Sequence, residues 1–105
     1  MSRVGKVIRT VRGDDIRVGE QAFMDGRDGA AVPPLTIKRI NLWQSVDRRR
    51  ITGQVRHGAR VWVMETRLNS DEGRWYFRVR WWWRTGWVPD VFVSAQRREV
   101  LGDLV

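Results

Sequence analysis

The sequence contains no cysteine and only one histidine, His57. These absences exclude a disulfide framework, a Cys-ligated metal site and a multi-histidine zinc site. We therefore expect no metal and no cofactor. Long hydrophobic runs are also absent: residues 1–15 lack the apolar segment of a secretory signal, and no stretch is long enough to cross a membrane. This pattern predicts a cytoplasmic protein without a membrane span, and a place in a virus particle remains open.

Positive charge dominates the residues that are present. Twenty Lys and Arg stand against twelve Asp and Glu, which gives a net charge of +8, and all of the basic residues except Lys6 and Lys38 are arginines. Such a balance favours anionic partners, and arginine suits phosphate, carboxylate and aromatic groups better than lysine does. At 105 residues the chain predicts one domain with a modest core, so each large aromatic side chain matters.

Aromatic residues concentrate in residues 74–94. This stretch holds five of the seven tryptophans, the only tyrosine and two of the three phenylalanines. Its first part alternates as a strand does. One face would carry Trp75, Phe77, Val79 and Trp81, and the other would carry Tyr76, Arg78 and Arg80. The stretch therefore supplies most of the expected core.

The N-terminal residues 6–18 are rich in β-branched side chains on both sides of Gly13-Asp14. This pattern predicts a β-hairpin with a two-residue type II′ turn. In that register Arg12 faces Asp15, and Val11 faces Ile16. A helix is the alternative, because the spacing of Val4, Val7, Ile8 and Val11 also fits one helical face.

Turn signals divide the rest of the chain. The steps Asp25-Gly26 and Asp28-Gly29 indicate tight turns rather than a calcium loop, and Pro33-Pro34 indicates a boundary. We expect an N-terminal β extension over residues 1–35, a barrel over 36–94 and a tail over 95–105 that is frayed or forms a short amphipathic segment. Within the barrel, the pattern predicts strands at 36–43, 52–56, 59–66 and 74–81, a helical turn at 89–92 and a closing strand at 93–94.

Residues 38–94 resemble the bacterial SH3 (SH3b) domain family. The resemblance is carried by Asn41-Leu42-Trp43, by residues 53–63, by residues 75–79, by Thr85-Gly86-Trp87-Val88 and by Phe92-Val93-Ser94. It implies a small SH3-like barrel, and the N-terminal residues lie outside the family pattern. Together with the hairpin predicted at residues 6–18, the expected fold is all-β: a small SH3-like barrel with an N-terminal β-hairpin extension. The first loop departs from eukaryotic SH3 domains, which carry acidic residues there. Asp47-Arg48-Arg49-Arg50 stands in its place, which favours an acidic partner.

The resemblance implies a non-catalytic module that binds a protein partner, through an acidic or extended segment. By motif position the ligand groove would use Trp43, Tyr76, Pro89 and Phe92, with Trp75 as a further candidate. The alternative role of these side chains is to fill and cover a small barrel. Trp82 and Trp83 fall near a turn, where burial is difficult, so together they predict an aromatic patch.

Two other functions stay open. A small barrel could bind nucleic acid through interleaved basic and aromatic side chains, with Tyr76 and Trp82 as stacking platforms. The basic face would comprise Arg48, Arg49, Arg50, Arg78, Arg80 and Arg84. The chain could also be a structural part of a phage particle or of a multiprotein complex, and homo-oligomers are not excluded. We expect no enzyme, because His57 has no cysteine to activate and no serine lies in a nucleophile motif.

Overall fold

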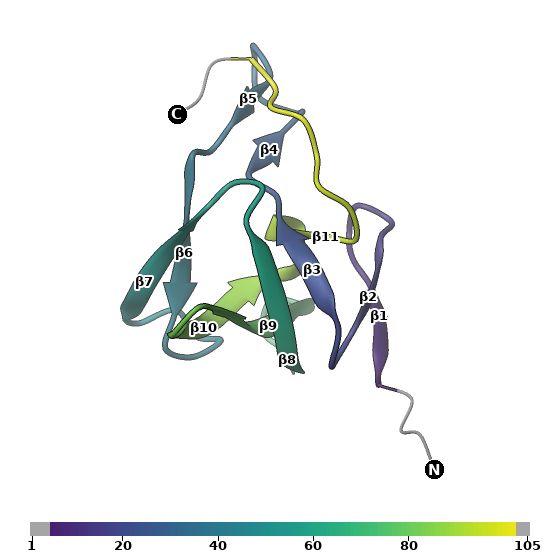
Figure 1. Ribbon diagram of the computed structural model, residues 1–105, viewed down its shortest axis with the longest axis vertical. Coiled ribbons are helices and arrows are strands. Elements are labelled where there is room, and N and C mark those ends of the chain that lie inside the picture. Colours follow the sequence, from purple (N-terminus) through teal and green to yellow (C-terminus); the bar gives the residue numbers. More distant parts are fainter. Residues whose placement is uncertain (1–4, 103–105) are drawn as a thin grey trace.

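A computed structural model describes residues 5–102 of the chain. The expected all-β class is confirmed, and its main sheet is a curled antiparallel half-barrel compatible with a small SH3-like barrel (Figure 1). No helix within residues 5–102 is long and apolar enough to span a membrane. The elements are β1 (Val7–Arg9), β2 (Asp15–Arg17), β3 (Gln21–Met24), β4 (Arg27–Asp28), β5 (Leu35–Thr36), β6 (Arg39–Trp43), β7 (Ile51–Arg56), β8 (Arg60–Asn69), β9 (Arg74–Trp81), β10 (Arg84–Pro89), the 3-10 turn η1 (Asp90–Phe92) and β11 (Val93–Ser94).

The main sheet has seven strands in the order β11-β3-β8-β9-β10-β6-β7, and two small sheets pair β1 with β2 and β4 with β5. β3 lies between β11 and β8, although it precedes the boundary that Pro33-Pro34 predicts. One strand of the predicted N-terminal extension, β3, is therefore built into the main sheet, whereas β1 and β2 form a separate hairpin. Pro33-Pro34 lies in the loop between β4 and β5, and β3 before this loop belongs to the same sheet as the strands after it.

The core lies on the concave side of the sheet and follows from alternation along the strands. Val61 and Val63 of β8 and Phe77 and Val79 of β9 are buried, as period two predicts. Trp75 and Trp81 lie on the same face of β9 and pack partly buried against this core. Each fully buried aliphatic or aromatic side chain contributes about 1.5 to 3 kcal/mol to stability.

Glycine is required where β10 crosses β6. A Cβ atom on Gly86 would stand 2.6 Å from the Cβ of Leu42 and 2.7 Å from the Oγ1 of Thr52. Contacts this short do not occur between real side chains, so the absence of a side chain lets the two strands approach. A larger residue at the centre of Thr85-Gly86-Trp87 would therefore clash with β6 and β7.

The N-terminal residues form a hairpin, and the alternative helix is wrong. The predicted register is also wrong, because Ile8 faces Ile16 and Arg9 faces Asp15. The loop has five residues, from Thr10 to Asp14, and the Thr10 N–H donates to the Asp14 carbonyl at 2.7 Å. This register places Ile8 and Ile16 opposite each other in the core, which a two-residue turn at Gly13-Asp14 would not do.

The tail does not fray over residues 95–102. Arg98 donates to the Asp14 carboxylate at 2.9 Å, and Arg97 donates to the Gly58 carbonyl at 3.2 Å. Farther along, the hydroxyl of Thr36 donates to the Leu101 carbonyl at 3.2 Å. Figure 1 shows this segment in yellow, running from β11 past β4 to β5. The tail therefore forms a strap across the top of the molecule. The last part of the predicted tail, residues 103–105, lies outside the described residues.

Candidate ligand-binding surface

The predicted ligand groove is not an open furrow. Tyr76 is 0% exposed and Pro89 is buried, whereas Trp43 and Phe92 are half-buried. Phe92 packs against the core cluster. Trp43 borders a hollow of about 400 Å³, but the aromatic residue that shares this hollow is Trp87. The four groove residues therefore do not form one accessible surface, because the side chains of Tyr76 and Pro89 are buried.

Tyr76 acts as a buried structural residue. Its hydroxyl donates to Oε1 of Glu72 at 2.7 Å across the turn that joins β8 to β9. Burial is the largest cause and this hydrogen bond the second, and they raise the pKa of Tyr76 to about 12. Because its side chain is buried, Tyr76 cannot serve as an exposed stacking platform.

The predicted basic face is divided in the structure. Ion pairs hold Arg48 to Glu72 at 3.5 Å, Arg49 to Asp47 at 3.1 Å and Arg78 to Glu65 at 2.7 Å. Within residues 5–102, no ion pair engages the other three predicted members, which are Arg50, Arg80 and Arg84. The partner of Arg49 lies in the same loop, whereas Glu72 and Glu65 come from another turn and from the neighbouring strand β8, so the sequence could not reveal the pairs of Arg48 and Arg78.

Trp82 and Trp83 form an aromatic tip, the name used here for this pair. They are the two central residues of the turn between β9 and β10, since Arg84 pairs with Trp81. Their exposed fractions are 74% and 83%. Trp82 has a φ of 58°, a backbone conformation that a bulky residue adopts only at a cost of about 1 to 3 kcal/mol. The turn therefore holds two large apolar side chains in solvent with a strained backbone, and both features are typical of binding surfaces.

A basic hollow of about 740 Å³ adjoins the aromatic tip. It is lined by Lys38, Arg39, all six residues of β7, Trp81 and Arg84, and no acidic side chain is among them. Arg39 and Arg56 stand directly opposite each other on β6 and β7, an arrangement of like charges that destabilises a sheet. The guanidinium of Arg84 lies 5.6 Å from the centre of the Trp81 ring. The hollow therefore presents positive charge that nearby side chains do not neutralise.

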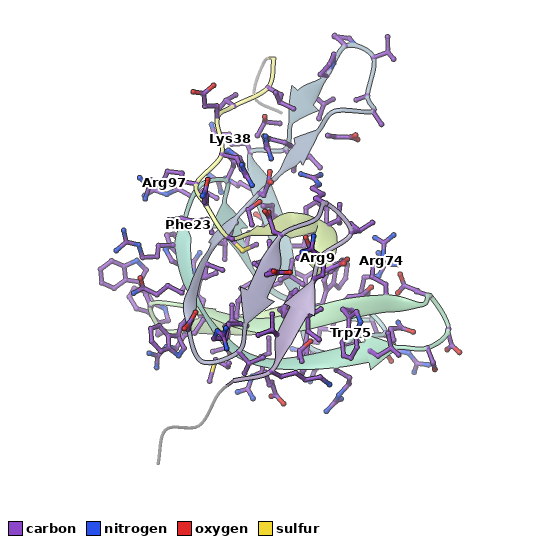
Figure 2. The ribbon with its side chains drawn as sticks, turned by 90° about the vertical axis from the view of Figure 1, so that its right-hand side faces the viewer. Arg9, Phe23, Lys38, Arg74, Trp75 and Arg97 are labelled. Atoms are coloured by element: carbon purple, nitrogen blue, oxygen red, sulfur yellow. The ribbon has the colours of Figure 1, made fainter. Side chains whose placement is uncertain are left out.

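A second group of basic residues extends this surface beyond the basic hollow. Arg60 and Arg97 lie over the ring of Phe23, at 5.7 Å and 5.4 Å from its centre. Figure 2 shows Arg97 and Phe23 on one side of the N-terminal hairpin, away from Arg74 and Trp75. Arg60 and Arg97 share a hollow of about 380 Å³ with Trp81 and Trp82. Basic and aromatic side chains thus surround the β9–β10 turn on two sides.

The sequence pattern predicts the aromatic tip and Arg84 but not the other basic residues of the hollow. Lys38, Arg39 and Arg56 carry no recognisable motif, and they meet only because β6 and β7 pair in a particular register. The available signal was the excess of arginine outside residues 48–50, and it does not specify a location. Pairing register is therefore the information that the sequence pattern lacked.

His57 has a structural role that explains both of its ring nitrogens. Its Nδ1 accepts the N–H of Gly26 at 3.0 Å, and its Nε2 lies 2.9 Å from the Arg98 carbonyl. A neutral imidazole satisfies both contacts when Nε2 carries the proton. The residue thereby links β3–β4 to the tail.

The fold and this surface together define a small all-β domain with an exposed basic and aromatic surface. No protein-family model, curated protein or solved structure matches this chain. The function must therefore be argued from the geometry of the surface itself.

Proposed function

We propose that this protein is a non-catalytic binding module that recognises an acidic, extended segment of a protein partner. The aromatic tip and the basic hollow form its binding surface. The single observation that carries the proposal is the placement of two exposed tryptophans on a strained turn beside a hollow with four basic residues and no acidic one. Aromatic side chains and arginine are the residue types that dominate binding energy at protein interfaces.

Charge supports an acidic ligand. Lys38, Arg39, Arg56 and Arg84 all line the basic hollow, and a carboxylate placed between Arg39 and Arg56 would relieve their mutual repulsion. Complementary charge of this kind mainly gives specificity and faster association. Apolar contact with Trp82 and Trp83 would supply most of the remaining affinity.

Nucleic acid is the second candidate, and the pairs that Arg60 and Arg97 make with Phe23 favour it. A basic surface with aromatic rings can bind single strands by phosphate contact and stacking. The support is weaker than for a protein ligand, since the predicted stacking platform Tyr76 is buried. A structural role in a phage particle or multiprotein complex would use the same exposed surface.

The test is capture of partners from an extract of the native host, with and without nuclease, at low and at moderate salt. Tagged wild-type protein is compared with the double variant Trp82→Ser/Trp83→Ser. The control is Leu68→Ser, which removes an exposed apolar side chain at the far end of β8. We expect a defined protein partner that survives nuclease and moderate salt, that the double variant loses and that the control retains.

Two results would contradict the proposal. Recovery of mainly nucleic acid, lost steeply as salt rises, would assign the surface to phosphate binding. Equal capture by the double variant and the wild type would show that the aromatic tip is not part of the site. Melting temperatures of all three proteins should be similar, because the replaced side chains are exposed.

A further inference from the structure

β7 is an edge strand that opens into the basic hollow. Within residues 5–102 it is the last strand of the main sheet and pairs with β6 alone, so no described strand lies along its other side. All six of its residues line the hollow. An unpaired strand edge offers backbone N–H and C=O groups to another chain, and proteins usually cover or interrupt such edges. Here the edge faces an open basic surface instead.

The backbone of Gln54 shows which groups this edge presents. Arg84 donates from Nη1 to the Gln54 carbonyl at 3.1 Å, so this carbonyl points away from β6 and toward the hollow. In an antiparallel strand the N–H and C=O of one residue point to the same side. The N–H of Gln54 therefore also points into the hollow, where an added strand would accept it.

We propose that the free edge of β7 binds an acidic extended segment by β-strand addition. The proposal rests on the function proposed above and specifies how that ligand is held. A polypeptide can continue the ladder of backbone hydrogen bonds, and a nucleic acid cannot, so the free edge favours a protein ligand. Alternate side chains of a strand lie on one face, so carboxylates at alternate positions of the incoming strand would all face the four basic residues of the hollow.

Arg84 has two roles in this arrangement. In the free protein its guanidinium covers the Gln54 carbonyl and rests near the ring of Trp81. An incoming backbone N–H replaces the guanidinium at this carbonyl, and a carboxylate of the ligand pairs with the released Arg84. Trp81 then forms an apolar wall for the side chains between the acidic ones. The edge is thus protected from random pairing and opens to an acidic strand.

The experiment uses a fluorescein-labelled peptide of about ten residues in which Val and Glu alternate, the period of a strand. Its affinity is measured by fluorescence anisotropy for wild type, Gln54→Pro and Gln54→Thr. Both variants lose the side-chain hydrogen bond from Gln54 to Asn41, but only Gln54→Pro removes the outward N–H. Proline at this edge position leaves the pairing with β6 intact, because the missing N–H is not directed at β6.

We expect Gln54→Pro to weaken peptide binding by about tenfold, and Gln54→Thr to stay within about twofold of wild type. Hydrogen exchange supplies a second readout. The peptide should slow exchange of the Gln54 amide in wild type, and this protection reports backbone pairing rather than charge attraction. A matching Val-Lys peptide should not bind.

The outcomes separate this proposal from the one on which it rests. Equal binding by Gln54→Pro and wild type, with loss in Trp82→Ser/Trp83→Ser, would overturn strand addition and leave the binding module in place. Absence of any Val-Glu binding would overturn acidic strand addition, and the capture experiment would then decide the proposed function by itself. Tight binding of a short oligothymidylate that is unaffected by Gln54→Pro would overturn both in favour of nucleic acid.

Discussion

Two arginine-rich regions of the molecule differ in what faces their guanidinium groups. In the first, here called the buried junction, the Asp25 carboxylate meets Arg12 at 3.2 Å, Arg27 at 3.0 Å and the hydroxyl of Ser94 at 2.5 Å. In the second, the basic hollow, arginines gather without an acidic neighbour. The same residue type therefore holds the fold together in one place and remains available to a ligand in the other, and the presence of an internal carboxylate decides between these roles.

The buried junction also shows how a charge can be buried without losing its ionised form. Burial by itself would raise the pKa of Asp25, but hydrogen bonds from Arg27 and Ser94 and the charge of Arg12 outweigh it. Together they hold the pKa well below its ordinary value. The junction joins the N-terminal loop, the start of β4 and β11, so its loss would loosen three segments at once.

The largest effect is expected for Asp25→Asn, which leaves Arg12 and Arg27 facing a neutral amide. Breaking a buried ion pair on one side costs about 3 to 5 kcal/mol, so the free energy of unfolding in urea should fall by that order. Asp28→Asn is the control, because Asp28 is exposed and accepts only the N–H of Ala30. A loss below about 1 kcal/mol would show that the junction is not a structural centre.

Wild type and Asp25→Asn should also differ in how their stability depends on pH. A carboxyl whose pKa is lowered by folding contributes stability above its unfolded pKa, and this contribution is lost as the pH falls below it. For Asp25 the ordinary value is 3.8. Wild type should therefore lose stability on acidification below that value, and Asp25→Asn should show a flatter profile in thermal melts across the acid range.

Titration of Tyr76 at high pH tests whether its phenol is buried. Its pKa is raised from 10.0 to about 12, so the stability that its neutral form provides is present below pH 10 and is lost as the pH rises toward 12. The contribution is about 3 kcal/mol. Because the chain has one tyrosine, absorbance at the phenolate band reports Tyr76 alone. Titration in the ordinary range of an exposed phenol would contradict its burial.

Trp82→Gly sharpens the contrast between stability and binding. Glycine adopts a φ of 58° without strain, so this variant should gain about 0.5 to 1 kcal/mol in the free energy of unfolding while it loses partner capture. Trp83→Gly is the matched control, since Trp83 does not have a positive φ. There glycine should reduce stability by about 0.5 to 1 kcal/mol. Equal stability changes in both variants would argue against strain at Trp82.

Arg56→Gln should have the smallest effect on stability and a clear effect on binding. Removal of one of two facing arginines should leave the free energy of unfolding unchanged or raise it by a few tenths of a kcal/mol. Affinity for the Val-Glu peptide should fall, and its dependence on salt should become flatter. Arg50→Gln, in the loop before β7 and outside the hollow, should change neither property.

Much of the fold could be predicted because alternation is a local signal. The buried residues Val61, Val63, Phe77 and Val79 follow from period two, whereas buried Tyr76 does not, and η1 follows from the residues after Pro89. The hairpin register could not be predicted, because a pattern of β-branched residues fits more than one pairing. The deciding contact is between Ile8 and Ile16 in the core, and it depends on the sheet beneath them.

The candidate site was predictable only where solvent exposure follows from local structure. Trp82 and Trp83 are exposed because a two-residue turn leaves no room to bury them. Tyr76 was misassigned to an open groove, because its partner Glu72 reaches it only after β8 and β9 have paired. The basic hollow depends on the register of β6 against β7. Long-range pairing, rather than composition, therefore determines which arginines are free.

The strap formed by the tail has a consequence for the order in which the protein folds. Arg98 and Asp14 are separated by 84 positions in the chain, and Thr36 and Leu101 by 65. Such distant contacts cost more loop-closure entropy than contacts between neighbours in the chain. A growing polypeptide must therefore synthesise residue 98 before the loop of its first hairpin can be clamped. The part of the chain that is made first is among the last to reach its final stability.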